Sequence, residues 1–195
     1  MRRLHLVRHA QTRQDSTVAS HAWRLTDLGE QQAVELAERV ATLSLSRVVT
    51  SEEPKAVRTG AVIARTLHLK AETRPGLAEH ARTTAPYFDR PEDFHAAIRA
   101  LFATPAERVF GEESANEAHD RFRAALTAFM AEREQDELVV THGTVLSLLV
   151  TRANDLDSFD FWQRELAMPM LVTLTWPSLK LVSIFTPPRA TRSAG

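Results

Sequence analysis

The chain contains no cysteine among its 195 residues, which excludes a disulfide framework and any phosphatase or protease mechanism that uses a cysteine nucleophile. An excess of one charge is also missing. The 24 Lys and Arg residues nearly balance the 25 Asp and Glu residues, so the composition does not favour binding to nucleic acid or to a membrane surface.

Long apolar runs are missing as well. The apolar stretch before Arg8 is too short for the core of a signal peptide, and the run from Val145 to Val150 is far below the roughly 20 residues that span a bilayer. We therefore expect a soluble, cytoplasmic protein with neither a membrane nor a nucleic acid as partner.

What the chain does contain is an alternation of strand and helix signals. Short apolar segments predict strands at 3–7, 47–50, 70–74, 138–141, 170–176 and 180–185, and helical spacing of apolar residues fills most of the intervals. This order predicts an α/β sandwich around a mostly parallel sheet. Only Pro177, Ser178 and Leu179 separate the last two strands, which should therefore pair antiparallel.

The length fits a single domain over residues 1–186, with residues about 77–113 forming a lid or insert, and a disordered tail over 187–195. Local signals set the helix starts. Thr26 and Ser51 are each placed to cap a helix, and Ser114 with Glu117 forms a capping box. Gly29 lies inside a first helical turn, where a close approach of another backbone would explain it.

Candidate chemistry follows the ends of the predicted strands. Leu6 and Val7 lead into Arg8 and His9, and Thr141-His142-Gly143 follows a later strand. Because the carboxyl ends of the strands in an open α/β sheet line one crevice, Arg8, His9, Arg58 and His142 are expected to converge there. Two arginines and two histidines form a site for a dianion such as a phosphoryl group, and the helix after His142 adds its amino-terminal dipole.

Six short elements occur in order along the chain: Leu6–Thr12, Leu25–Gly29, Thr50-Ser51 followed by Lys55, Arg58 and Thr59, Leu77-Ala78-Glu79, Gly111–Ser114, and Val139–Gly143. Together they resemble the histidine phosphatase superfamily, which includes cofactor-dependent phosphoglycerate mutases and many small phosphatases. The resemblance covers nearly the whole chain. It implies a three-layer α/β/α sandwich with a mostly parallel six-stranded sheet and an antiparallel strand near the C-terminus.

The resemblance also implies a mechanism. His9 would attack phosphorus and become a phosphohistidine, and Glu79 would protonate the leaving oxygen and then deprotonate the attacking water. Arg8, Arg58 and His142 would hold the phosphoryl oxygens, so neither a metal nor another cofactor is expected.

Further substrate-binding residues are expected at Gly143, Thr12 and Arg82. Thr12 has the alternative role of capping a turn. For Arg82 the sharper hypothesis is that it reaches a second anionic part of the substrate, and the alternative is a surface position. Asp15 stands where several relatives carry a phosphate-contacting asparagine, and its charge would repel a dianion, so it is not assigned to the site.

These inferences favour a metal-independent phosphomonoesterase acting on a small phosphorylated substrate, as a monomer or homodimer. A phosphoglycerate mutase is the alternative, although the extended segment that such mutases carry after the acid is absent here. A non-catalytic phosphate-binding domain is a third. Residues 13–24 and 80–113 should form the pocket walls, and Trp23, Trp162 and Trp176 are interpreted as packing residues rather than as a stacking platform.

Overall fold

A computed structural model describes residues 2–164 and 167–187. Its strands are β1 (Arg3–Arg8), β2 (Arg47–Thr50), β3 (Lys70–Thr73), β4 (Glu137–Thr141), β5 (Met170–Thr175) and β6 (Leu181–Phe185). Its helices are α1 (Asp27–Val40), α2 (Pro54–Thr66), α3 (Pro91–Ala103), α4 (Ala115–Met130), α5 (Gly143–Asn154) and α6 (Ser158–Arg164), with a short 3-10 helix, η1, at Ser20–Ala22.

One six-stranded sheet organises these elements in the order β3-β2-β4-β1-β5-β6. The first four strands of this order are parallel, whereas β5 pairs antiparallel with both β1 and β6. The predicted α/β architecture, with one antiparallel strand near the C-terminus, is confirmed. The described part of the chain contains no helix long and apolar enough to cross a membrane.

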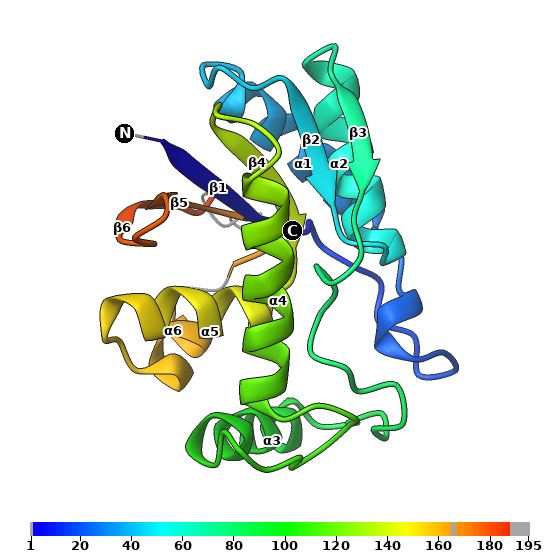
Figure 1. The fold of residues 1–195 in the computed structure, drawn as a ribbon. Helices are drawn as coiled ribbons and strands as arrows, with labels where there is room; N and C mark the ends of the chain where they lie inside the picture. Colours follow the sequence, from blue (N-terminus) through cyan, green and yellow to red (C-terminus); the bar gives the residue numbers. More distant parts are fainter. Residues whose placement is uncertain (1, 165–166, 188–195) are drawn as a thin grey trace.

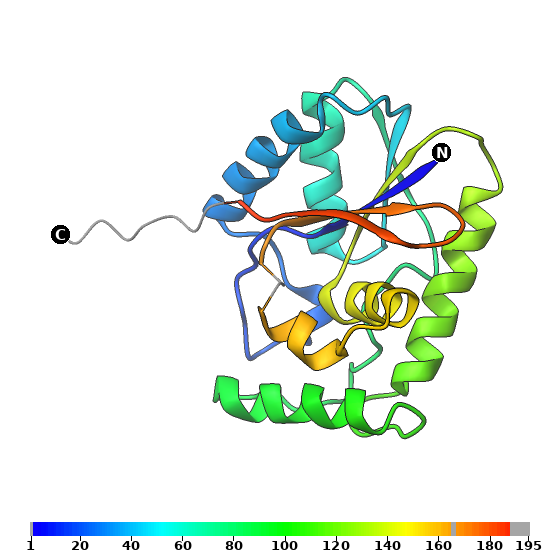
Figure 2. The same cartoon turned by 90° about the vertical axis from the view of Figure 1, so that its left-hand side faces the viewer.

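Helices cover both faces of the sheet (Figures 1 and 2). Neighbouring residues of a strand point to opposite faces, so Leu6 packs into the core beneath α4 and α5, whereas Val7 packs into the core beneath α1 and α2. α3 lies beyond the edge of this sandwich, below α4 in Figure 1. The long segment from β3 to α4 therefore projects past the carboxyl ends of the parallel strands.

Two of the three predicted helix caps are confirmed and one is wrong. Thr26 accepts a hydrogen bond from the Gly29 amide, and Ser114 with Glu117 forms the full capping box, as predicted. A Cβ at Gly29 would lie 2.2 Å from the Gln11 carbonyl oxygen, which confirms the close backbone approach. The prediction for Ser51 was wrong, because α2 begins at Pro54 with Glu53 at the N-cap, and the Ser51 hydroxyl bonds His142 instead.

Two predicted segments extend past the described residues. The interval between the strands predicted at 138–141 and 170–176 contains α6, Ser158–Arg164, and residues 165–166 lie outside the described residues. The tail expected over 187–195 lies outside it from residue 188 onward.

Candidate active site

A cavity of about 560 Å³ opens at the carboxyl ends of the parallel strands. Arg8 and His9 reach it from the end of β1, Lys55 from the first turn of α2, and Gly143 and Thr144 from the start of α5. Thr12, Glu79 and Arg82 line it from loops. The crossing connections of a parallel sheet thus bring these residues together, although they are far apart in the sequence.

His9 is held in one tautomer. Its Nδ1 lies 2.8 Å from the carbonyl oxygen of Ala10, and because a carbonyl can only accept, Nδ1 carries the proton and Nε2 carries a lone pair. Its amide donates to the Thr141 carbonyl, which fixes the backbone across β1 and β4. Burial, with neighbouring His142 and Arg8, holds the pKa of His9 well below its ordinary value. Nε2 is therefore unprotonated at neutral pH and carries a lone pair.

Two cations flank His9. Burial lowers the pKa of Arg8 to about 10, so its guanidinium stays charged at neutral pH. The Lys55 ammonium lies 2.6 Å from a carboxylate oxygen of Glu53 and donates to the Ser20 carbonyl at 2.7 Å. Burial lowers the pKa of Lys55, while Glu53 acts to raise it.

The structure does not bring Arg58 to this site. Its guanidinium turns toward α1 and forms a bidentate pair with Glu30, and half of its side chain is exposed. Lys55 and Thr59 lie one helical turn apart on the buried side of α2, and Arg58 falls beside that face rather than on it. Lys55 occupies the place that the sequence reasoning gave to Arg58.

Glu79 is an anion in this structure. Its carboxylate accepts hydrogen bonds from the amides of Thr144, Val145 and His80 at 2.9–3.2 Å, and Arg82 Nη2 lies 3.7 Å away. Burial acts to raise the pKa of Glu79, but Arg82 and these amides outweigh it and lower the pKa to about 2. The amino-terminal amides of α5, expected to face a phosphate, are thus bound by Glu79.

Arg82 lies at the same end of the cavity. Its guanidinium faces Glu79, bonds the Thr144 hydroxyl at 3.4 Å and lies over the Phe94 ring, 5.3 Å from its centroid. This position places a third cation in the cavity beside Glu79 and the start of α5, and a contact of Arg82 with a second anionic part of a substrate stays a prediction.

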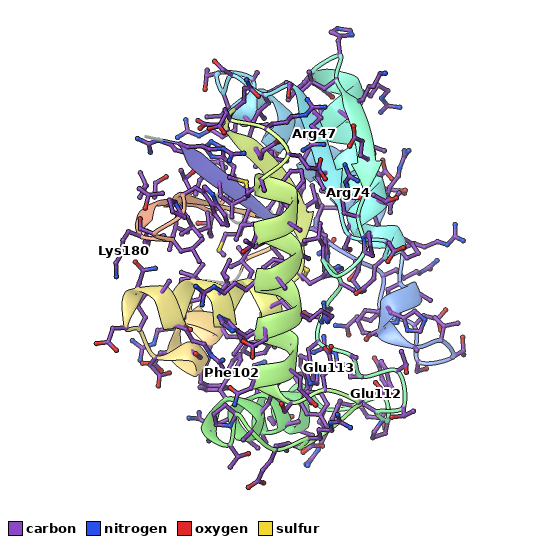
Figure 3. All side chains as sticks on the ribbon, viewed as in Figure 1. Arg47, Arg74, Phe102, Glu112, Glu113 and Lys180 are labelled. Atoms are coloured by element: carbon purple, nitrogen blue, oxygen red, sulfur yellow. The ribbon has the colours of Figure 1, made fainter. Side chains whose placement is uncertain are left out.

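The loop that carries Glu79 and Arg82 is clamped by the segment before α4. Glu112 and Glu113 are labelled in this segment in Figure 3. Glu112 accepts hydrogen bonds from the Thr83 and Thr84 amides, and Glu113 accepts from the Ala81 amide. Arg121 of α4 pairs with Glu113 and donates to the carbonyls of residues 76, 78 and 79. His80, whose role the sequence left open, bonds the Glu113 carbonyl at 2.6 Å.

His142 is fully buried beside His9, with ring centroids 5.3 Å apart, and does not line the cavity. Its Nε2 lies 2.6 Å from Ser51 Oγ and 3.4 Å from a carboxylate oxygen of Glu53. Glu53, which the sequence reasoning missed, also accepts from the Glu79 amide at 2.8 Å. Nothing in its surroundings along the sequence distinguishes Glu53 from a first-turn carboxylate on a surface helix.

The outer wall of the cavity was also missed. It is built from the expected segments 13–24 and 80–113 together with α6, and it includes the aromatic side chains of Trp23, Tyr87, Phe88, Phe94 and Trp162. Trp162 and Trp176 both pack against the core, as predicted, and Trp162 lines the cavity as well. Asp15 bonds the Thr17 amide and hydroxyl, away from the cavity lining. Within the described residues, no group of three or more His, Cys, Asp or Glu side chains is placed to bind a metal ion.

Solved structures share this architecture. A mycobacterial glucosyl-3-phosphoglycerate phosphatase aligns with a TM-score of 0.71 at 20% identity, covering 93% of this chain and 96% of that one. A phosphoserine phosphatase variant from Entamoeba histolytica, in complex with phosphoserine, aligns with a TM-score of 0.72 at 15% identity, covering 94% and 96%. At these identities the likeness concerns the fold.

Sequence comparison shows the family as well as the fold. A probable phosphoglycerate mutase GpmB of Proteus mirabilis is 27% identical over 169 residues, 82% of this chain and 78% of that protein. Its counterpart in Erwinia tasmaniensis is 29% identical over 161 residues, 77% and 74% respectively. The family model for branch 1 matches residues 4–181, and the chain therefore belongs to the histidine phosphatase superfamily (branch 1).

Proposed function

We propose that this protein is a phosphomonoester hydrolase that works through a phosphohistidine on His9. The observation that carries the proposal is the state of His9: a buried, neutral imidazole whose Nδ1 is bound to a carbonyl and whose Nε2 is free beside Arg8 and Lys55. A neutral nucleophile among fixed cations suits attack on an anionic phosphoryl group.

In the first step, Nε2 of His9 forms a bond to phosphorus as the bond to the leaving oxygen breaks. Arg8, Lys55 and Arg82 balance the charge on the three remaining oxygens, and Glu79 gives its proton to the leaving alkoxide. His142 holds its place beside His9 through Ser51 and Glu53. A direct contact of His142 with the phosphate stays a prediction, as do those of Thr12 and Gly143.

The proton on Glu79 comes with the substrate. A phosphomonoester has a second pKa of about 6, so its monoanion brings one proton. The negative charge that remains on the substrate pairs with Arg82 and the other cations of the cavity. These cations then stabilise the Glu79 carboxylate less, so the pKa of Glu79 rises and the carboxylate can take up the proton. After the alcohol leaves, the Glu79 carboxylate accepts a proton from water, the water oxygen bonds to phosphorus, and the bond to His9 breaks.

A phosphoglycerate mutase is the second candidate, and the names of the curated relatives favour it. Such an enzyme has to hold a bisphosphate with several negative charges. Among the described lining residues, the Arg and Lys side chains are Arg8, Lys55 and Arg82, and two of them already face Glu53 or Glu79. This charge balance suits one phosphate better than two, which favours hydrolysis.

The test is phosphate release from a panel of phosphomonoesters with EDTA present, comparing wild type with His9→Ala. Release that survives EDTA and is lost in the variant supports the hydrolase. A mutase instead interconverts phosphoglycerates, depends on a bisphosphate primer and keeps a base-stable, acid-labile phosphoryl group on His9 for minutes. Phosphate binding with no turnover and no labelling would overturn both, leaving a non-catalytic binding domain.

A further inference from the structure

The outer half of the cavity differs in chemistry from the inner half. Arg8, Lys55, Arg82 and Glu79 surround His9, whereas Trp23, Tyr87, Phe94 and Trp162 form the wall beyond them. These aromatic side chains are only partly buried, and Tyr87 is 41% exposed. Phe94 and Trp162 also pack against the core, but large apolar side chains that line a cavity together offer a surface for an apolar ligand group.

The wall is assembled from segments that are distant in the sequence. Trp23 follows η1, Tyr87 comes from the loop after β3, Phe94 from α3 and Trp162 from α6. Trp23 and Tyr87 meet edge to face, with ring centroids 6.5 Å apart, and Phe94 meets Trp162 at 5.7 Å. These contacts hold the rings in fixed orientations, so they present planar faces and edges to a ligand ring.

Arg82 joins the two halves. Its guanidinium faces Glu79 at the phosphate end and lies over the Phe94 ring at the start of the wall. A group attached directly to the phosphate would therefore pass from the cations onto the aromatic surface. A cavity of about 560 Å³ is large enough for a phosphate and a ring.

The wall offers little to an anion. Among the described residues that line the cavity, Lys and Arg occur only at the phosphate end, and the outer lining includes the carboxylate of Asp89. Neutral polar side chains such as Gln14 and Gln163 also line it, as does His95, whose ring meets that of Trp162 at 5.3 Å. A carboxylate or second phosphate on the substrate would find no Lys or Arg among these outer residues and would face a like charge, which disfavours its binding.

We infer that the substrates of this protein are phosphomonoesters whose alcohol half is aromatic and carries no second acidic group. This inference rests on the proposed function, because it assigns the substrate of the same site. The specificity-determining residues are Trp23, Tyr87, Phe94 and Trp162, of which Tyr87 at the exposed rim is the safest to replace without affecting the core.

The experiment compares substrates with similar alkoxide leaving groups, so that chemical reactivity does not mask recognition. We expect kcat/KM for 2-phenylethyl phosphate to exceed that for ethyl phosphate and 3-phosphoglycerate about tenfold. Tyr87→Ala and Trp23→Leu should each lower the ratio of phenylethyl to ethyl phosphate at least threefold. Val182→Ala, which removes an exposed apolar side chain on β6, serves as the matched control and should keep the wild-type ratio.

A wild-type ratio below threefold, a preference for 3-phosphoglycerate, or an unchanged ratio in both wall variants would overturn the inference. If no phosphomonoester is hydrolysed, the proposed function fails while the wall can still be judged. Calorimetry then compares 2-phenylethylphosphonate with ethylphosphonate, which need no turnover. Tighter binding of the phenyl compound by about tenfold, lost in Tyr87→Ala, supports the aromatic subsite, and equal binding overturns it.

Discussion

Lys55, rather than Arg58, should supply the second cation of the phosphate site, and paired substitutions test this. Lys55 is almost fully buried and lines the cavity, so Lys55→Ala removes a charge that water replaces poorly. Loss of one such transition-state contact costs about 10²–10³-fold in kcat. Arg58 lies outside the cavity lining in an exposed pair with Glu30, a type of interaction worth about 0–1 kcal/mol. Because Arg58 does not line the cavity, Arg58→Ala should leave kcat/KM close to the wild-type value and cost only about 0–1 kcal/mol of folding free energy.

Lys55→Ala also leaves the buried Glu53 carboxylate without its ammonium partner, and breaking a buried pair costs about 3–5 kcal/mol of folding free energy. A Glu53→Gln/Lys55→Gln double variant removes both charges and should recover stability. Urea unfolding and phosphate-release kinetics are measured on wild type, on these three variants and on Glu53→Gln alone. Because Glu53 also contacts His142 and the Glu79 amide, the role of Lys55 at the phosphate is supported if the stable double variant loses far more activity than Glu53→Gln alone. Wild-type kinetics in the double variant, or a hundredfold loss in Arg58→Ala, would refute it.

Three further predictions concern the loop held by the segment before α4, the buried Arg47–Glu137 ion pair, and the pH dependence of stability. Gly111 has φ +85°, and a Cβ there would lie 2.6 Å from Arg82 Cα, so Gly111→Ala should displace the loop and lower kcat/KM at least about tenfold in steady-state assays. Arg47, at the amino end of β2 (Figure 3), pairs with the fully buried Glu137 carboxylate of β4, so Arg47→Met strands that carboxylate. Urea unfolding should therefore show a loss of about 3–5 kcal/mol, with wild-type kcat per folded molecule. Because buried His9 stays neutral while the unfolded chain takes up a proton, wild type should lose about 1 kcal/mol more unfolding free energy than His9→Asn between pH 6.5 and 5.5. An equal loss in both proteins would contradict the lowered pKa.

The fold was largely predictable because its signals are local. The boundaries of the predicted strands agree with the observed ones within one residue, and helices fill most of the intervals as expected, since apolar runs and spacing report burial directly. Thr26 and the Ser114–Glu117 box are caps that depend on neighbouring amides alone. Ser51 failed as a cap because His142, 91 positions further along the chain, competes for its hydroxyl.

The site was predictable only where a motif carries its own geometry. Arg8 ends its strand and His9 follows directly, so both reach the carboxyl edge of the sheet. Glu79 reaches the same edge from the loop after β3. The choice between Lys55 and Arg58 depends on which part of α2 packs against α1, a tertiary contact. The charge state of Glu79 depends on the α5 amides and Arg82, and the aromatic wall on four separate segments. By itself the sequence determined the elements and the family resemblance, and it predicted His9 as the nucleophile. Only the tertiary structure decided which charges and rings lie around His9, because these contacts form between residues that share no sequence neighbourhood.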